Sequence, residues 1–469
     1  MKKRNKNTGY HVMPPAFRAE PVSSTQDPII VELNVMTNDG PQNLILRESD
    51  MSKHILALGG IGSGKTNLID LLMDQVCQKL TDRDVVVVFD TKGDYLRKFS
   101  SPGDLVFGNL TTVPRGVELA KWNIYREAMI DPEHINANLI EICKSLFMER
   151  SLHNNNPFFP NAGRDILYSV MTAHINDQNQ REWNNASLLR YFQDLDIERV
   201  RELLARHPAL QSSKYYISGN TPQTQGVVSE VVQLVKEVFT EAFALNGTTS
   251  IREAVRQKGK RKIFVEYDLG IGNMLTPVYR LLLDMAIKEA LCRDRKDGNV
   301  YIFIDEFALL PQMQHISNGV NFGRELGVKL IAGLQNTEQL TEAYGEHMAA
   351  SILSGFNTRF FFKVNDSVSR EYVQKLLGTA RELCSFDSHC SGVEPKEEIL
   401  TTNVLEDWVY ETLPVGTAVY YQNGKKAQVV GLPRFTGRNQ PPINNFDPNS
   451  PRSDPGSVST VPGFRIINK

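Results

Sequence analysis

HILALGGIGSGKTNLIDLL, residues 54–72, is the stretch that decides the fold. A short apolar run gives way to glycines, a lysine and a threonine, and apolar residues then return at helical spacing. Gly59, Gly64, Lys65 and Thr66 satisfy the pattern G-x-x-x-x-G-K-S/T, which is typical of a phosphate-binding loop between a strand and a helix. We therefore expect this segment to bind ATP. The predicted binding residues are Gly59, Gly60, Ile61, Gly62, Ser63, Gly64, Lys65 and Thr66.

Each residue type in this loop has a physical reason to be there. Glycines let the backbone wrap a phosphate chain with its N–H groups pointing inward. The positive end of the following helix faces the same anion. Lys65 is expected to reach the β- and γ-phosphates, and Thr66 to place its hydroxyl on Mg²⁺, a cation that prefers oxygen ligands. The alternative is a glycine-rich strand–helix turn with a chance lysine.

Hydrolysis needs more than a binding loop, because a carboxylate must hold the metal and a polar group must orient water. The segment VYIFIDEF (300–307) supplies two acidic residues at the end of an apolar strand. We expect Asp305 to join Thr66 as a metal ligand and Glu306 to polarise the attacking water. The alternative is that the acidic pair only ends the strand or caps a helix.

Two further residues are candidates for catalysis. Gln335 ends the apolar run VKLIAGLQ (328–335), at the strand end where ligands bind in parallel sheets. It could sense the γ-phosphate or the water, or it could be a solvated loop residue. Arg324 lies in NGVNFGRELGV (318–328), on an expected helix. It could be a finger that reaches a neighbouring subunit's nucleotide, or an exposed helix arginine.

Composition narrows the class of protein. The chain has 469 residues, is 41% hydrophobic and 23% charged, and carries a formal net charge of −2. Any nucleic-acid contact must therefore come from a local lining such as a ring pore, not from a broad basic face. The five cysteines are too few and too scattered for a disulfide framework, which points to a reducing compartment, and no pair of them has zinc-knuckle spacing. These cysteines are Cys77, Cys143, Cys292, Cys384 and Cys390.

Strand signals occur on both sides of a long helical region. They cover residues 29–35, 54–58, 84–90, 262–268, 300–306, 328–335, 359–364 and a hairpin around Asn423-Gly424. This pattern predicts an α/β fold with a mainly parallel sheet, interrupted by an all-helical insertion. The expected domains are a flexible arm (1–27), a nucleotide-binding domain (28–128 and 249–435), the helical insertion (129–248) and a disordered tail (436–469).

Two local features could contact DNA, although each also has an ordinary explanation. The run RQKGKRK (256–262) is basic, but such a run more often solubilises a helix–strand turn. The aromatic segment NPFFPN (156–161) could stack on bases, but core packing is the commoner fate of such residues.

The motifs together resemble a known family. GGIGSGKT, FDTKGDY, FIDEF, the Arg324 segment and GLQ have the order and spacing of the type IV coupling proteins of bacterial conjugation. These are the TraD/TraG-like members of the FtsK–HerA group of DNA-pumping ATPases. VFDTKGDYLRKF (88–99) is particularly diagnostic: Asp90 ends a strand near the expected nucleotide, and Gly93 permits a turn. KWNIYREAM (121–129) and NPFFPNAGRDIL (156–167) resemble the family's helical subdomain.

The resemblance, which covers residues 28 to 435, implies a function. It implies a RecA-like ATPase that uses ATP and Mg²⁺, with Arg324 acting in trans, assembled as a homo-hexamer that draws single-stranded DNA through its channel. A relaxase and secretion-channel ATPases or membrane proteins are the implied partners. Many coupling proteins carry N-terminal transmembrane helices, whereas the residues before the loop here are polar. We therefore expect no intrinsic membrane anchor: either a partner recruits the motor to the inner face of the membrane, or the motor works in the cytoplasm.

Several functions fit these observations. The leading hypothesis is a DNA-translocating motor that delivers a relaxase-bound strand to a secretion channel. A soluble HerA-like ATPase that works with a nuclease in DNA processing or defence is an alternative. A motor that moves protein substrates is another, and a nucleotide-gated scaffold without enzymatic activity is a fourth. Glu306 and Gln335 argue against the scaffold, because a mere switch does not need a water-orienting pair.

Overall fold

A computed structural model describes residues 27–437, except for residues 111, 154, 178–182, 294–296 and 387–395. Nearly all of the expected arm and of the expected tail lies outside the described residues. The expected domain boundaries stay predictions. Within the described residues, no helix is both long and apolar enough to cross a membrane.

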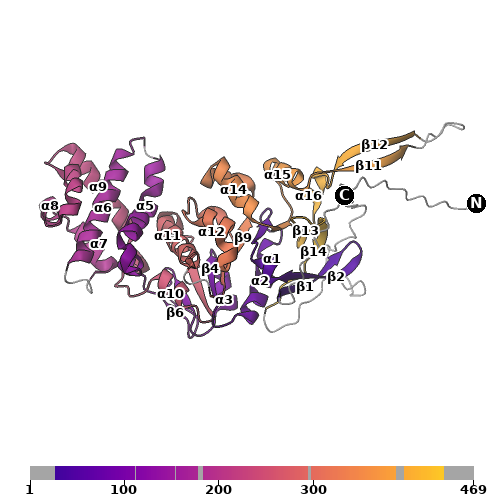
Figure 1. Cartoon of the computed structure of the whole chain (residues 1–469), viewed down its shortest axis with the longest axis horizontal. Helices are drawn as coiled ribbons and strands as arrows, with labels where there is room; N and C mark the ends of the chain where they lie inside the picture. The colour runs from indigo at the N-terminus through magenta and orange to yellow at the C-terminus, as the bar shows by residue number, and fades with distance from the viewer. Residues whose placement is uncertain are drawn as a thin grey trace, which may run out of the picture.

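A large sheet forms the centre of the molecule (Figure 1). Its strands occur in the order β2 (Gly40–Arg47), β1 (Ile29–Thr37), β14 (Gln428–Gly431), β13 (Thr417–Gln422), β10 (Thr358–Phe361), β3 (Ile55–Leu58), β9 (Val328–Leu334), β8 (Val300–Ile304), β4 (Val85–Asp90), β7 (Arg261–Glu266), β5 (Leu105–Phe107) and β6 (Glu118–Leu119). From β10 to β6 neighbouring strands are parallel, and the remaining pairs are antiparallel. The predicted α/β class with a mainly parallel sheet is confirmed.

Strand β4 shows why the sheet is buried on both faces. Its sequence VVVVFD is β-branched almost throughout, as expected of a strand covered by helices on each side. Val85, Val87 and Phe89 belong to one hydrophobic core. Val86 and Val88 belong to the other. Alternate side chains point to opposite faces of a strand, so this single strand contributes to both cores.

Helices cover both faces of the sheet. Side chains of α2 and α3 pack in one core, and side chains of α11 to α16 pack in the other. The helices and 3-10 turns of this part are α1 (Glu48–Met51), α2 (Lys65–Lys79), α3 (Asp94–Phe99), α11 (Gly272–Ala290), η6 (Phe307–Leu309), α12 (Ile316–Phe322), η7 (Gly323–Leu326), α13 (Thr337–Tyr344), α14 (Glu346–Gly355), α15 (Ser367–Leu377) and α16 (Asp407–Thr412).

The elements between β6 and β7 are all helical in the described part of the chain. They are α4 (Ile124–Met129), η1 (Pro132–His134), α5 (Ile135–His153), α6 (Phe158–Asn176), α7 (Asn185–Gln193), α8 (Ile197–Ala205), η3 (Pro208–Ile217), α9 (Pro222–Val238), η4 (Glu241–Ala244) and α10 (Ile251–Gln257). Figure 1 shows α5 to α9 gathered as a bundle at one end of the molecule, and we call these helices the bundle. An all-helical insertion was predicted here.

Ion pairs join α10 and Asp131, the residue before η1, to helix α11. Arg252 and Arg256 of α10 both contact Asp131 and Glu289. Glu289 lies on α11, and its side chain is only 2% exposed. Removing one partner of such a buried pair leaves an uncompensated charge, which is strongly destabilising. The start and the end of the helical region are therefore attached to α11 through charged contacts.

Some strands were not predicted from the sequence. Strands β2, β5 and β6 are additions to the main sheet, and β11 (Thr379–Phe386) pairs with β12 (Lys396–Asn403) in a separate two-stranded sheet. Figure 1 shows this hairpin projecting from the body of the molecule, at the end away from the bundle.

Candidate functional site

The phosphate-loop glycines are required by the local geometry. Gly62 and Gly64 have φ values of +72° and +117°, which strain any other residue. A Cβ on Gly64 would lie 3.0 Å from the Cα of Gly416. One on Gly59 would lie 2.7 Å from the Cβ of Phe362. The loop is thus held between β3, α2 and two segments that lie far away in the sequence.

Lys65 begins helix α2 and is nearly buried. Its ammonium donates to the carbonyl oxygens of Gly59 at 2.5 Å and Gly60 at 3.1 Å. Burial lowers the pKa of Lys65, and the negative charges of Glu306 and Asp305 oppose that shift. The N-cap of α2 is Gly64, which has no side chain to satisfy the first amides of the helix. The loop therefore presents N–H groups and a cation where a phosphate chain would bind.

Asp305 directly follows β8, next to the loop. The Thr66 hydroxyl donates to Asp305 Oδ2 at 3.4 Å. Burial raises the pKa of Asp305, and the nearby Lys65 charge lowers it. No group of three or more His, Cys, Asp or Glu side chains among the described residues could hold a metal ion by itself. A hydroxyl and a carboxylate are nevertheless hard oxygen ligands that suit Mg²⁺, which usually combines few protein ligands with water and phosphate oxygens.

Glu306 and Gln335 form a second contact, at the carboxyl ends of β8 and β9. The amide nitrogen of Gln335 donates to Glu306 Oε2 at 2.6 Å. The other oxygen, Oε1, is buried and has no hydrogen-bond partner among the described residues. Burial raises the pKa of Glu306, and the bond from Gln335 lowers it. One oxygen is therefore anchored, and the other is available to a water molecule.

Arg324 lies away from these residues. It is exposed on η7, a 3-10 turn where a helix was expected, and it has no ion pair or hydrogen bond to any described residue. It precedes β9, whereas Gln335 follows this strand. The seven residues of β9 span about 20 Å, so the two residues lie at opposite ends of this strand. Of the predicted residues, the structure brings together the loop, Asp305, Glu306 and Gln335, but not Arg324.

The motif FDTKGDY has a structural role that the geometry explains. Asp90 is fully buried and accepts hydrogen bonds from the backbone N–H groups of Leu96, at 2.8 Å, and Lys92, at 3.3 Å. Gly93 has a φ of +66° and caps α3. Asp90 therefore holds the turn that follows β4. The same turn places Lys92, which we did not predict as a site residue, where its charge lowers the pKa values of Asp305 and Glu306.

The basic run 256–262 is partly consumed in ion pairs. Arg256 contacts Glu289 at 2.8 Å, and Lys262 contacts Asp104 at 2.9 Å. Lys262 is only 5% exposed. These contacts favour a structural role for the run over contact with DNA.

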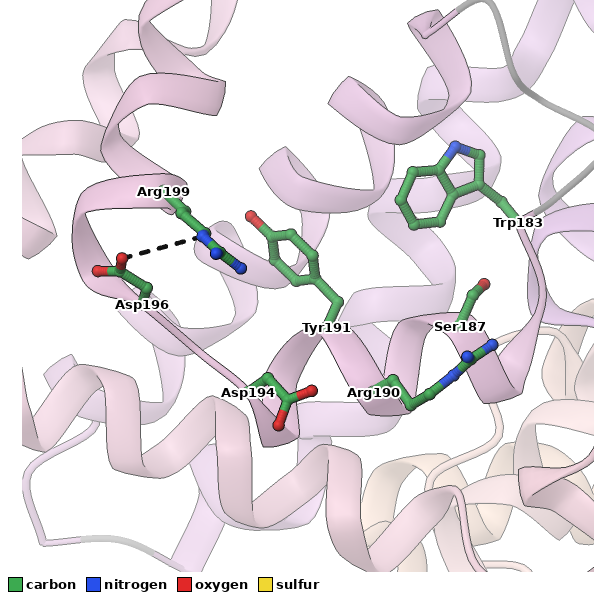
Figure 2. A pocket seen from close by; sticks show the side chains of 7 residues that line it. All are labelled: Trp183, Ser187, Arg190, Tyr191, Asp194, Asp196 and Arg199. Carbon is green, nitrogen blue, oxygen red and sulfur yellow. Dashed lines mark ion pairs between the residues drawn. The ribbon is translucent and has the colours of Figure 1, made fainter.

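A separate hollow of about 330 Å³ lies in the bundle (Figure 2). Figure 2 shows Tyr191 between Trp183 and Arg199 at its wall, with Arg199 paired to Asp196 at 4.0 Å. Its lining residues are Trp183, Ser187, Arg190, Tyr191, Asp194, Asp196 and Arg199. The two arginines and two aspartates balance in charge, so the hollow offers no net attraction to a phosphate chain.

Comparison with known proteins gives one family. The profile described as the type IV secretion-system coupling protein DNA-binding domain matches residues 43–398. The chain is also similar to coupling protein TraD of Escherichia coli (strain K12), with 24% identity over 365 residues. That alignment covers 76% of this chain and 48% of TraD. The chain therefore spans about half the length of this curated relative.

Solved structures of one coupling protein have a similar fold. The unbound monoclinic form of the bacterial conjugative coupling protein TrwBdeltaN70 has a TM-score of 0.69 and 18% identity, over 87% of this chain and 90% of that chain. TrwB in complex with ADP and Mg²⁺ has a TM-score of 0.67 and 19% identity, over 87% and 91% respectively. At these identities the likeness concerns the fold alone, and it agrees with the RecA-like class expected from the sequence.

Proposed function

The chain belongs to the family of type IV secretion-system coupling proteins, and from this premise we propose that it is an ATP-hydrolysing motor that moves DNA. The observation that carries the proposal is that two pairs of side chains meet at the carboxyl ends of the parallel strands. Thr66 contacts Asp305, and Gln335 contacts Glu306, beside the lysine of a phosphate-binding loop. A binding loop, a metal-binding pair and a water-orienting pair are the parts that phosphoryl transfer needs.

Binding of ATP begins at the loop. Amides of residues 59–66 surround the phosphates, and Lys65 exchanges the carbonyls of Gly59 and Gly60 for β- and γ-phosphate oxygens. Thr66 and Asp305 would hold Mg²⁺, which neutralises charge on the phosphates when bound. TrwB, a structural neighbour, has been solved with ADP and Mg²⁺.

Cleavage depends on Glu306. Its free oxygen, Oε1, accepts a proton of the attacking water, and Gln335 holds the other oxygen still. Arg324 lies at the end of the parallel strands opposite to its own chain's phosphate-binding loop. It therefore serves a neighbouring copy's nucleotide in a homo-hexameric ring. An arginine supplied in trans stabilises the charge that develops during phosphoryl transfer.

The cargo and partners follow from the family. The motor delivers single-stranded DNA, bound to a relaxase, to the ATPases and membrane proteins of a secretion channel. It consumes ATP on the cytoplasmic side, where a partner recruits it to the inner face of the membrane. Family membership supports this function over a nuclease-linked HerA-like ATPase and over a motor for protein substrates.

The test is steady-state ATP hydrolysis with and without single- and double-stranded DNA. We expect DNA to stimulate the wild-type rate, and Glu306→Gln to lose turnover by about 10²- to 10⁴-fold while still binding MgATP. A motor for protein substrates would hydrolyse ATP at a rate that DNA does not change. Unchanged turnover in Glu306→Gln would refute the catalytic assignment.

A further inference from the structure

The segment that follows Glu306 is anchored by buried side chains. We call residues 307–315 the connector, because it joins the end of β8 to helix α12. Phe307 and Leu310 are fully buried, and Met313 is 3% exposed. Gln312 has a φ of +59°, a left-handed conformation that costs a residue with a side chain free energy. A strained position therefore lies six residues after Glu306.

One side of the connector is fastened to the helix that follows Gln335. The Gln312 amide donates to the carbonyl oxygen of Ala343 at 2.8 Å, and the Tyr344 hydroxyl donates to that of Leu310. The rings of Phe307 and Tyr344 are stacked, with centroids 5.7 Å apart. Ala343 and Tyr344 end α13, which begins two residues after Gln335. The connector therefore bridges the chain segments that carry both members of the Glu306–Gln335 pair.

The other side of the connector contacts the bundle at Glu141. The Glu141 carboxylate contacts the imidazole of His315, and the Gln314 amide donates to the Glu141 carbonyl oxygen at 3.3 Å. Glu141 lies on α5, a long helix of the bundle. Helix α5 and α12 are labelled on either side of α11 in Figure 1. A single bundle residue thus touches two successive residues of the connector.

Helix α11 completes this contact. Lys288 pairs with the same Glu141 carboxylate, and Arg280 joins Glu149 of α5, at 2.6 Å, to the connector carbonyl of Pro311. Burial would raise the pKa of Glu141, but the hydrogen bonds from His315 and Lys288 lower it to about 2. Glu141 is therefore ionised throughout the neutral range and is held from two sides.

We propose that Glu141 is a positioning residue through which the bundle controls ATP turnover, by moving the connector and with it Glu306 relative to Gln335. The inference rests on the proposed function and adds a route between two parts of the motor. A load on the bundle displaces α5, and the contacts of Glu141 with Gln314 and His315 pass that displacement to the connector. Coupling of this kind needs a contiguous set of packed and hydrogen-bonded groups, which the contacts above provide.

The experiment compares Glu141→Gln with wild type in the full chain, by ATP hydrolysis with and without single-stranded DNA. The matched control is Glu230→Gln, which removes a half-buried bundle carboxylate that pairs with Arg150 at 3.2 Å and makes none of the connector contacts described above. Gln314→Ala removes the second contact without changing charge. We expect Glu141→Gln to reduce the ratio of stimulated to basal rate by about 2- to 30-fold, Gln314→Ala to reduce it in the same direction, and Glu230→Gln to leave it as in wild type.

Two results would count against the inference, and they are distinguishable. If DNA stimulates wild type, Glu141→Gln and Gln314→Ala equally, the inference is overturned and the proposed function stands. If DNA does not change the wild-type rate, the proposed function fails and the inference falls with it. Thermal unfolding of each variant separates loss of coupling from loss of fold, because a merely structural role would lower stability without changing the ratio.

Discussion

Replacing Gln335 by alanine tests the proposed water-orienting role of the Glu306–Gln335 pair by removing a single hydrogen bond. The wild-type amide donates to Glu306 Oε2 at 2.6 Å, while Oε1 has no partner among the described residues. Hydrogen bonds to charged groups contribute about 1.5–3 kcal/mol. If that bond is needed in the transition state, its loss slows turnover by about 10- to 150-fold. We expect a decrease of this size in the rate constant, with nucleotide affinity close to that of wild type.

The pH profile gives a second, independent readout of Gln335→Ala. The bond from Gln335 lowers the pKa of Glu306 against burial, which raises it. Without the bond the pKa of Glu306 rises, so its carboxylate ionises only at higher pH. Because the base must be ionised to accept a proton, the acidic limb of the rate profile should move to higher pH.

The assay is steady-state ATP hydrolysis at a series of pH values, with binding of a fluorescent ATP analogue measured in parallel. Gln428→Ala, at an exposed position of β14, is the matched control. A Gln335→Ala rate within threefold of wild type, with an unmoved acidic limb, would refute the role of this bond. Loss of analogue binding instead of turnover would show that Gln335 acts on bound substrate and not on Glu306.

Three further outcomes follow from the geometry. Lys92→Ala should weaken ATP binding by no more than about fivefold, because the residue is exposed, and should affect ADP less; titration with both nucleotides checks this. Relative to wild type, Glu266→Gln should gain stability as pH rises from 5 to 8. Burial, with the nearby Asp90 charge, raises the pKa of Glu266 from 4.5 to about 7. The folded wild type therefore holds a proton that the unfolded chain has lost, and its stability falls as that proton dissociates across this pH window. Thermal unfolding at both pH values should show a gain of about 1 kcal/mol at the higher one, less than the full pKa shift would give, because the side chain is only half-buried and solvent screens its charge. An equal difference at both pH values would contradict the cause. Arg324→Ala should slow turnover by about 10³-fold or more and spare ADP binding, and mixing it with Lys65→Ala should restore part of the rate; no recovery would argue against action in trans.

Local patterns allowed most of the parallel sheet to be predicted. The loop at residues 59–66 and the run 84–90 are read from neighbouring residues alone, because glycine placement and β-branched runs act locally. The confirmed fold class rests on these signals. The roles given to Asp305, Glu306, Gln335 and Arg324 stay predictions, although the structure places the first three at the edge that the strand ends indicated.

Pairing between strands that lie far apart in the sequence could not be predicted from such local patterns. Strand β1 pairs with β14 through Met36 and Gly431, from opposite ends of the described chain. The close approach of Gly416 to Gly64 is likewise set by tertiary packing. Lys92 was missed because its position depends on how β4 and β8 lie side by side, although its place in FDTKGDY, directly after a strand end, was a usable signal.

The most direct test of the central claim is displacement of streptavidin from a biotinylated DNA strand by the purified chain. Hydrolysis at the edge that carries Lys65 and Glu306 should drive movement along DNA. We expect wild type to remove streptavidin with ATP, and neither wild type with ADP nor Glu306→Gln with ATP to do so. Displacement by Glu306→Gln at the wild-type rate, or rapid ATP hydrolysis by wild type without displacement, would contradict the claim that this site powers DNA transport.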